Sequence, residues 1–305
     1  MGSYPIYNLY PMVGRIFELI CGREELKHSI GENGLHKTIK VAIRKNKEDI
    51  PIAEIHRIYI AESNTHKNQI VVYDYFCQFL WSLCYLVKIS VEQSIIRANI
   101  DPDTPIDGEL YNNAIEVFEA GLGLFSNPES SYTFPDVRQF EDKNIAETNF
   151  IYSRALCFIL FHEYAHNDLH NIDQIGNKEE EYEADFYAMY KILSSVDEDT
   201  PIKDRLLTYV GCILGIGSLF FIDKTLKGGE YHPDTDERLD YVLHKAGEYF
   251  NCQEDIEFCY TWAVAIFKTW IYFYDIPRLE ECDCDSFTAL YDQYRNFYKE
   301  YKAHI

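Results

Sequence analysis

The sequence predicts a mainly α-helical (α+β) protein. Residues 1–100 are expected to form a small β-strand-rich N-terminal part that includes an aromatic helix. This helix is expected to pack on a helical core formed by residues 101–305. The chain has 305 residues and 47% of them are hydrophobic, which is enough for a sizeable buried core. β-Branched or alternating runs occur before Tyr73, whereas apolar residues recur at three- and four-residue spacing after it.

Three short segments in the N-terminal part are predicted to be strands. Each is rich in β-branched residues or alternates between apolar and polar residues, and polar turns separate them. They are KTIKVAIR at 37–44, EIHRIYIA at 54–61 and QIVVY at 69–73.

The rest of the chain is predicted to be helical. The first helix covers 73–100 and ends before Asp101-Pro102. Segments rich in Asp, Ser and Pro, such as SNPESSYTFPD at 126–136, are expected to form turns or helix caps. The further helices are expected near 109–123, 146–168, 178–195, 203–223, 234–250, 252–275 and 285–302.

Charge and cysteine content limit the partners and the compartment. The formal net charge of -22 argues against nucleic acid and against an anionic membrane surface, since both would repel the chain. The nine cysteines are an odd number spread along the sequence, and no secretory leader pattern opens it. We therefore expect free thiols and a cytoplasmic location.

One apolar run raises the question of a membrane. LLTYVGCILGIGSLFFI, residues 206–222, contains 17 residues without a charge, which is the lower limit for spanning a bilayer. A core helix with glycines for close packing has the same composition. No other run approaches this length, so a core helix is the favoured interpretation and a membrane span remains the alternative.

The stretch HEYAH, residues 162–166, predicts a metal site. Residues four apart lie on one face of a helix, so His162 and His166 can bind one ion through their imidazoles. Glu163 lies one step around the helix, beside the metal rather than on it. When an H-E-x-x-H motif of this kind binds zinc, its glutamate carboxylate takes a proton from the zinc-bound water that attacks the substrate.

A third ligand is expected from the segment EEEYEADFY, residues 179–187. A catalytic zinc ion needs three protein ligands and one open position. Only Glu181 among these glutamates has an Asp one turn later, and Asp185 could orient a histidine through its second ring nitrogen. Glu183 points to another face. Ile172 stands where a metzincin would carry its third histidine, and His170 is the weaker remaining candidate.

His232 is a candidate for a catalytic role. It opens the stretch HPDTDERL, residues 232–239, which is expected to lead into a helix. A positively polarised histidine near the zinc could stabilise the oxyanion that forms when water attacks a peptide carbonyl. A surface or capping histidine is the alternative.

These motifs together carry a family resemblance. FHEYAH, then EEEYEAD, then HPDTDERL resemble the glutamate-ligand zinc peptidases, and the whole chain is loosely similar to the Lit family of bacterial phage-exclusion (cell-death) peptidases. The resemblance implies a zincin-like metallopeptidase core in which His162 and His166 bind Zn²⁺ and Glu163 is the catalytic acid/base. It also implies a cytoplasmic enzyme of abortive infection that cuts elongation factor Tu, with a phage-derived activator as a further expected partner.

Two other functions remain open at this point. A membrane peptidase of the HtpX type shares HExxH, a following acidic segment and His-Pro…Arg, and residues 206–222 would be its membrane helix. The chain could also be an inactive zincin-like binding module that uses zinc structurally. Glu163 argues against the second alternative, because a structural site gains little from an unliganded carboxylate beside the metal.

Overall fold

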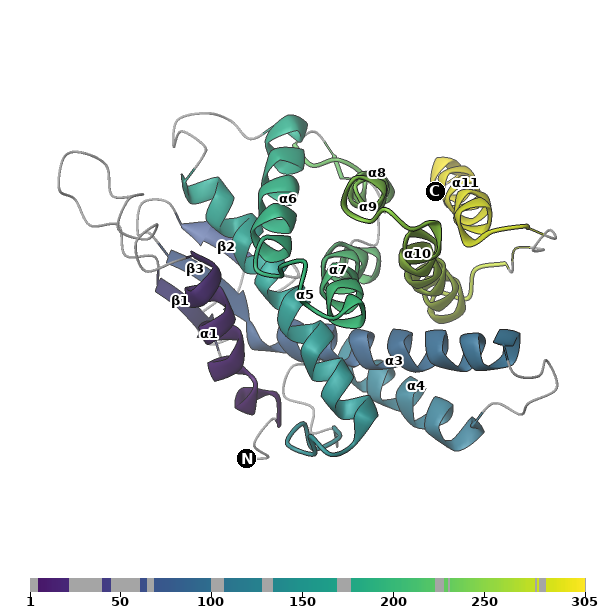
Figure 1. The fold of residues 1–305 in the computed structure, drawn as a ribbon, viewed down its shortest axis with the longest axis horizontal. Coiled ribbons are helices and arrows are strands. Elements are labelled where there is room, and N and C mark those ends of the chain that lie inside the picture. Colours follow the sequence, from purple (N-terminus) through teal and green to yellow (C-terminus); the bar gives the residue numbers. More distant parts are fainter. Residues whose placement is uncertain are drawn as a thin grey trace.

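The computed structural model is mainly helical, with a small sheet at one edge (Figure 1). It describes residues 5–21, 40–44, 61–64, 69–99, 107–127, 134–168, 177–222, 228–229, 231–277, 279 and 284–304. The helices are α1 (Tyr10–Cys21), α3 (Asp74–Asn99), α4 (Gly108–Gly123), α5 (Lys143–Asp168), α6 (Lys178–Leu193), α7 (Ile202–Gly217), α8 (Thr235–His244), α9 (Ala246–Tyr249), α10 (Gln253–Phe273) and α11 (Phe287–His304). The 3₁₀-helices are η1 (Pro5–Asn8) and η4 (Ser218–Phe221).

The predicted mainly α fold is confirmed, and each expected helix is present within a few residues of its expected bounds. Two differ in detail. The helix expected at 203–223 ends at Gly217 and continues as η4, and the one expected at 234–250 is interrupted at Lys245 between α8 and α9. A capping box of Asp234 and Glu237 starts α8, because each side chain bonds the other's backbone N–H.

Helix α1 was not predicted from the sequence. It contains Pro11 and Gly14, and both residue types weaken a helical signal. Its buried face includes Val13 and Phe17, and the Phe17 ring stacks on Phe161 of α5 with 4.6 Å between centroids. Packing against α5 therefore stabilises a segment that local propensity leaves ambiguous.

The sheet has three strands, β1 (Lys40–Arg44), β2 (Ala61–Asn64) and β3 (Gln69–Tyr73), in the order β1-β3-β2. Strand β3 pairs with β1 in parallel and with β2 in antiparallel orientation. The strands predicted at 37–44 and 69–73 are confirmed over the residues described. The strand predicted at 54–61 lies outside the described residues except for Ala61, where β2 begins. The division at residue 100 stays a prediction.

Helix α5 forms the centre of the fold and crosses the middle of the view in Figure 1. It packs against α1, α3, α6 and α7. The segment Ala155–Phe161 is buried on all sides, with exposed fractions of 0–7%. Burial of so much apolar surface fixes α5 in place, and therefore fixes the two histidines that follow the segment.

Helix α7 and η4 contain the apolar run that raised the membrane question. Among the described residues, Ile202–Phe221 is the one helical stretch long and apolar enough to cross a bilayer, and 78% of its most apolar window is buried inside the protein. Its glycines allow close contact with α5, since a Cβ on Gly211 or Gly215 would meet α5 atoms. Both observations favour the core-helix interpretation.

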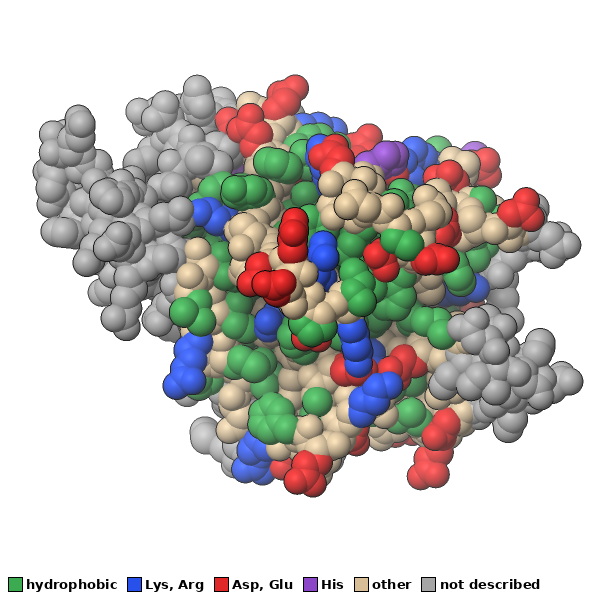
Figure 2. All heavy atoms as spheres, in the orientation of Figure 1, with side chains coloured by type: hydrophobic (Ala, Val, Ile, Leu, Met, Phe, Trp, Pro, Cys, Tyr) green, Lys and Arg blue, Asp and Glu red, His purple; other side chains and the backbone are tan. Residues whose placement is uncertain are grey.

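The surface view in Figure 2 shows acidic, basic and apolar side chains interspersed on this face, rather than one block of a single type. The net charge of -22 belongs to the whole chain. On this face the acidic side chains are therefore mixed with basic ones rather than gathered in one patch.

We predict that Gly211→Ala destabilises the fold. Its Cβ would meet Arg154 Cβ and lie 3.1 Å from the Ala155 backbone nitrogen, so α5 and α7 must separate. The free energy of unfolding should fall by about 1–2 kcal/mol in urea denaturation. Gly14→Ala is the matched control because nothing lies within 4 Å of its Cβ, and it should gain up to about 1 kcal/mol. Equal stability of the two variants would contradict the tight α5–α7 contact.

Candidate metal centre

The C-terminal part of α5 presents two imidazoles to the same point. Asp142 caps the start of the helix by accepting the N–H of Asn144 at 2.7 Å. One turn separates His162 from His166, and their Nε2 atoms are 3.1 Å apart. His162 is 8% exposed, while the His166 side chain is 24% exposed. The pair thus lies where the buried helix reaches the surface.

Helix α6 supplies an acid that faces these imidazoles. Its buried residues follow helical spacing and form one inward stripe. Glu181 and Asp185 occupy two positions of this stripe, with exposed fractions of 6% and 0%, whereas Glu183 is exposed. The stripe explains why one glutamate of the acidic run points inward and its neighbour does not. The buried positions are Glu181, Ala184, Asp185, Ala188, Met189, Ile192 and Leu193.

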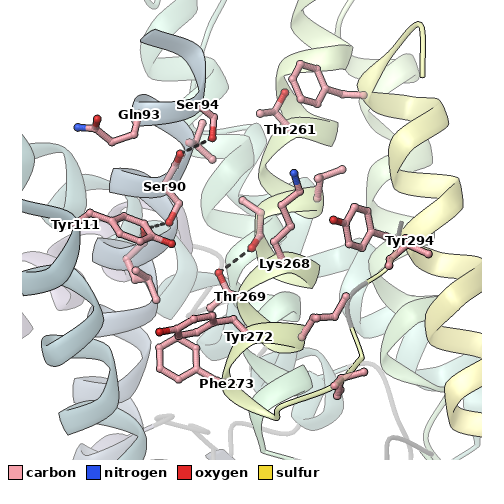
Figure 3. A pocket seen from close by; sticks show the side chains of 18 of the residues that line it. Ser90, Gln93, Ser94, Tyr111, Thr261, Lys268, Thr269, Tyr272, Phe273 and Tyr294 are labelled. Atoms are coloured by element: carbon pink, nitrogen blue, oxygen red, sulfur yellow. Dashed lines mark hydrogen bonds between the residues drawn. The ribbon is translucent and has the colours of Figure 1, made fainter. Parts of the chain in front are cut away.

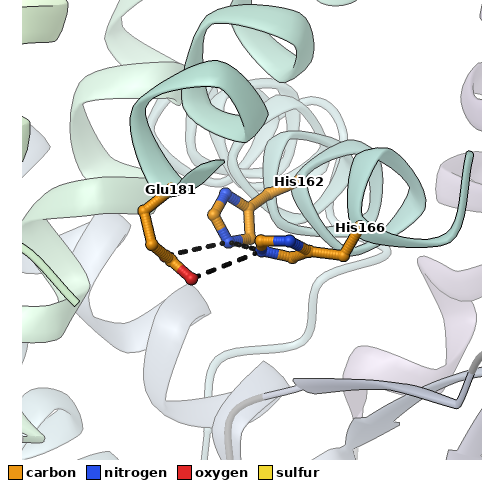
Figure 4. Close-up of side chains that lie close together, drawn as sticks. All are labelled: His162, His166 and Glu181. Atoms are coloured by element: carbon orange, nitrogen blue, oxygen red, sulfur yellow. Dashed lines mark hydrogen bonds and ion pairs between the residues drawn. The ribbon is translucent and has the colours of Figure 1, made fainter. Parts of the chain in front are cut away.

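His162, His166 and Glu181 come together as a group able to hold a metal ion (Figure 4). The His162 Nε2 lies 3.5 Å from Glu181 Oε2, and the His166 Nε2 lies 3.4 Å from Glu181 Oε1. Ligand atoms bound at 2.0–2.1 Å around one tetrahedral zinc ion are roughly 3.3–3.4 Å apart. The separations of 3.1, 3.4 and 3.5 Å fit such an ion.

Asp185 contacts the other nitrogen of His162. Its Oδ1 is 2.9 Å from His162 Nδ1, so a proton on Nδ1 leaves the Nε2 lone pair directed at the metal position. Burial would raise the pKa of Asp185, but the positive charge of Arg238 and the hydrogen bonds from His162 and Arg238 lower it. Burial and the charge of Arg238 lower the pKa of His162, but the hydrogen bond to Asp185 and the negative charges of Asp185 and Glu181 together raise it above its ordinary value. Asp185 is therefore a carboxylate that accepts a hydrogen bond from His162 Nδ1–H.

His232 lies at the exposed edge of the group. Its Nδ1 is 3.0 Å from Glu181 Oε1, and 62% of its side chain is accessible. The hydrogen bond to Glu181 raises the pKa of His232. For Glu181, burial would raise the pKa, but His232, His162 and Arg238 lower it well below its ordinary value. The structure thus places His232 beside the metal group, with one ring nitrogen already engaged.

Arg238 is a member of the cluster that sequence reasoning missed. It lies on the buried face of α8 and contacts both Asp185 and Glu181, at 2.7 and 3.3 Å. HPDTDERL supports a helix start, a candidate role for His232 and the family resemblance, but no role for Arg238 was predicted from it. The available signal was chemical, since two acids on an inward stripe require a buried cation nearby.

Glu163 follows His162 on α5 and is partly exposed. Its negative charge contributes to raising the pKa of Arg238, so it lies within electrostatic range of the cluster. The candidate ligand His170 falls in 169–176, outside the described residues.

A cavity of about 770 Å³ lies elsewhere, between α3, α4, α10 and α11 (Figure 3). Its lining combines apolar residues such as Leu86 and Val264 with Ser90, Thr261 and Lys268. None of the predicted site residues lines it. The metal group is therefore separate from this cavity.

The sequence model of the Peptidase U49 family matches residues 70–265. The match covers more than half of the chain and includes every described residue of the cluster, so the chain belongs to the Peptidase U49 family and is a peptidase. No curated protein and no solved structure matches the chain.

We predict that His162→Ala, His166→Ala and Glu181→Ala each prevent stoichiometric retention of Zn²⁺ or Co²⁺ by the purified protein, because each removes a ligand. Metal content per chain after dialysis measures this. Glu183→Ala is the matched control, since Glu183 is exposed on the same helix, and it should bind as the wild type does. Loss of metal from the Glu183 variant but not from the Glu181 variant would show that the wrong glutamate was chosen.

We predict that Asp185→Asn keeps the fold and weakens metal binding by roughly 10–100-fold, the usual effect of removing a carboxylate that orients a ligand. Competition with a chromophoric chelator measures the affinity. Unchanged affinity would assign Asp185 to the ion pair with Arg238 alone.

Proposed function

We propose that this peptidase is a zinc-dependent endopeptidase and that His162, His166 and Glu181 hold the ion. The observation that carries the proposal is the spacing of their ligand atoms, which fits a tetrahedral ion, in a buried group opening at His166 and His232. Two imidazoles and a carboxylate are a known donor set for catalytic zinc.

A bound zinc ion would supply Lewis-acid chemistry, making a water molecule reactive at neutral pH and withdrawing electrons from the peptide carbonyl. Glu163 would accept the proton of the attacking water and pass it to the leaving amine. Its position beside His162 and its partial exposure suit a group that must meet both water and substrate.

His232 would assist at the carbonyl oxygen. Its Nδ1 is engaged by Glu181, so Nε2 is the ring nitrogen that can donate to a substrate. An N–H of His232 that donates to the carbonyl oxygen can stabilise a developing oxyanion. The exposed side chain lies where a polypeptide could reach it.

We further propose that the target is an intracellular protein, with elongation factor Tu as the first candidate, and that the enzyme acts in the cytoplasm in phage defence by abortive infection. This part rests on the resemblance to the Lit family, which also suggests a phage-derived activator. The acidic charge supports a protein substrate over nucleic acid.

Two alternatives are weaker. A membrane peptidase of the HtpX type would use α7 and η4 as a membrane helix, but most of that stretch is buried in the fold. An inactive binding module would keep the metal group without needing Glu163, and the following experiment separates it from the enzyme.

We predict that Glu163→Gln binds zinc normally, folds normally and cuts its target at least ~100-fold more slowly, because glutamine cannot take the proton. Wild type and variant are expressed in a bacterium, and newly formed protein termini are compared by mass spectrometry. Termini within elongation factor Tu that depend on Glu163 would support the proposed target.

Glu183→Gln is the control, because it makes the same chemical change on an exposed helix surface. It should generate the same termini as the wild type. If the Glu163→Gln protein also generated them at the wild-type rate, Glu163 would not be the catalytic acid/base and HEYAH would not be the catalytic centre. A wild type that generated no new termini would favour the inactive binding module.

A further inference from the structure

Arg238 of α8 connects the two buried acids of α6. It is 8% exposed, and its Nε and Nη2 donate to Asp185 Oδ2 and Oδ1, each at 2.7 Å. Its Nη1 lies 3.3 Å from Glu181 Oε2. The contact with Asp185 is a two-pronged guanidinium–carboxylate pair, which fixes the plane of the carboxylate as well as its position.

Packing alone does not account for these charges. Glu181 and Asp185 are four residues apart on one buried face, so their charges repel each other and both are costly to desolvate. Apolar residues at 181, 185 and 238 would continue the stripes of α6 and α8, and replacing a buried ionic cluster in this way is often neutral or stabilising. The cluster therefore indicates a role beyond stability.

The contacts of Arg238 extend to two of the three proposed ligands. Asp185 Oδ1 accepts from Arg238 at 2.7 Å and lies 2.9 Å from His162 Nδ1. Fixing this carboxylate fixes the ring of His162. Glu181 Oε2 lies between Arg238 Nη1 at 3.3 Å and His162 Nε2 at 3.5 Å. One guanidinium thus restrains Glu181 directly and His162 through Asp185.

We propose that Arg238 is a positioning residue that holds Glu181 and His162 in ligand geometry before a metal ion binds; the proposal rests on the proposed function of this cluster. Arg238 is not itself a ligand, because a guanidinium stays protonated and has no lone pair to donate. It acts by orienting side chains that do bind.

Lysine can test whether charge or geometry matters. A lysine ammonium is a point charge on a flexible stem and cannot reproduce two parallel bonds to one carboxylate while reaching a second. Arg238→Lys keeps the positive charge but loses the two parallel N–H donors of the guanidinium. If Arg238 acts by positioning, lysine should restore little of the metal affinity.

Arg295 of α11 provides a matched control. Its side chain, which is 17% exposed, contacts two aspartates of α8, the helix that carries Arg238. Nη1 lies 2.5 Å from Asp240 Oδ2, and Nε lies 3.6 Å from Asp236 Oδ2. Arg295→Gln therefore removes a largely buried ion pair from α8 without touching the metal group. It reports any loss of affinity that comes from a loosened helix alone.

The experiment measures Zn²⁺ affinity by chelator competition for wild type, Arg238→Gln, Arg238→Lys and Arg295→Gln. We expect the Gln and Lys variants at 238 to bind about 10–100-fold more weakly, and Arg295→Gln to stay within about twofold of wild type. The visible spectrum of the Co²⁺-loaded protein, which reports ligand geometry, should change for the variants at 238 only.

Wild-type affinity in Arg238→Gln would overturn the positioning role while leaving the metal site intact. Wild-type Zn²⁺ affinity in Arg238→Lys would show that the positive charge at residue 238, and not the two-pronged guanidinium geometry, holds the ligands. If Arg238→Gln does not fold, the double variant Asp185→Asn/Arg238→Gln, which leaves no unpaired charge at Asp185, is compared with Asp185→Asn alone. It should bind Zn²⁺ more weakly than Asp185→Asn, because the restraint of Glu181 by Arg238 is also lost; equal affinity of the two refutes the proposal. A wild-type protein that binds no Zn²⁺ would refute the proposed function and this inference together.

Discussion

The contact between α5 and α6 is the constraint on which the site depends. Each helix places polar groups on a face that otherwise belongs to the core, and those groups are tolerable only because they meet each other. Two imidazoles from α5 face two carboxylates from α6, and Arg238 from α8 balances the excess negative charge. The burial of Ala155–Phe161 holds α5 rigid, so the histidines cannot move far from their partners.

Local patterns were sufficient for part of this site. The spacing of His162 and His166, and that of Glu181 and Asp185, is the spacing of one helical turn, so a sequence can reveal which side chains share a face. The contact between these two helix faces belongs to the tertiary structure. It was inferred from the ligand requirements of zinc rather than from the spacing of residues in the sequence. Arg238 was missed because two inward-facing acids require a cation nearby but do not indicate which cation of the chain supplies it, and Arg238 lies 53 positions from Asp185.

The fold shows the same limit. The long helices carry enough apolar periodicity to be predicted within a few residues, whereas α1 is stabilised mainly by its contact with α5, and the break between α8 and α9 has no clear local signal. The run in α7 was ambiguous for another reason. A helix surrounded by protein and a helix surrounded by lipid need similar compositions, and only burial within the fold favours one of them.

Helix α11 lies beyond the region matched by the family model, yet it contacts the helix that carries Arg238. The family match stops at residue 265, within α10, but Arg295 and Lys302 of α11 pair with Asp236 and Asp240 of α8 and with Asp234, its N-cap. A protein shortened to the matched region would expose this acidic side of α8, including the fully buried Asp236, and mutual repulsion would loosen the helix that carries Arg238. The packing of α8 thus depends on residues that lie beyond the family match.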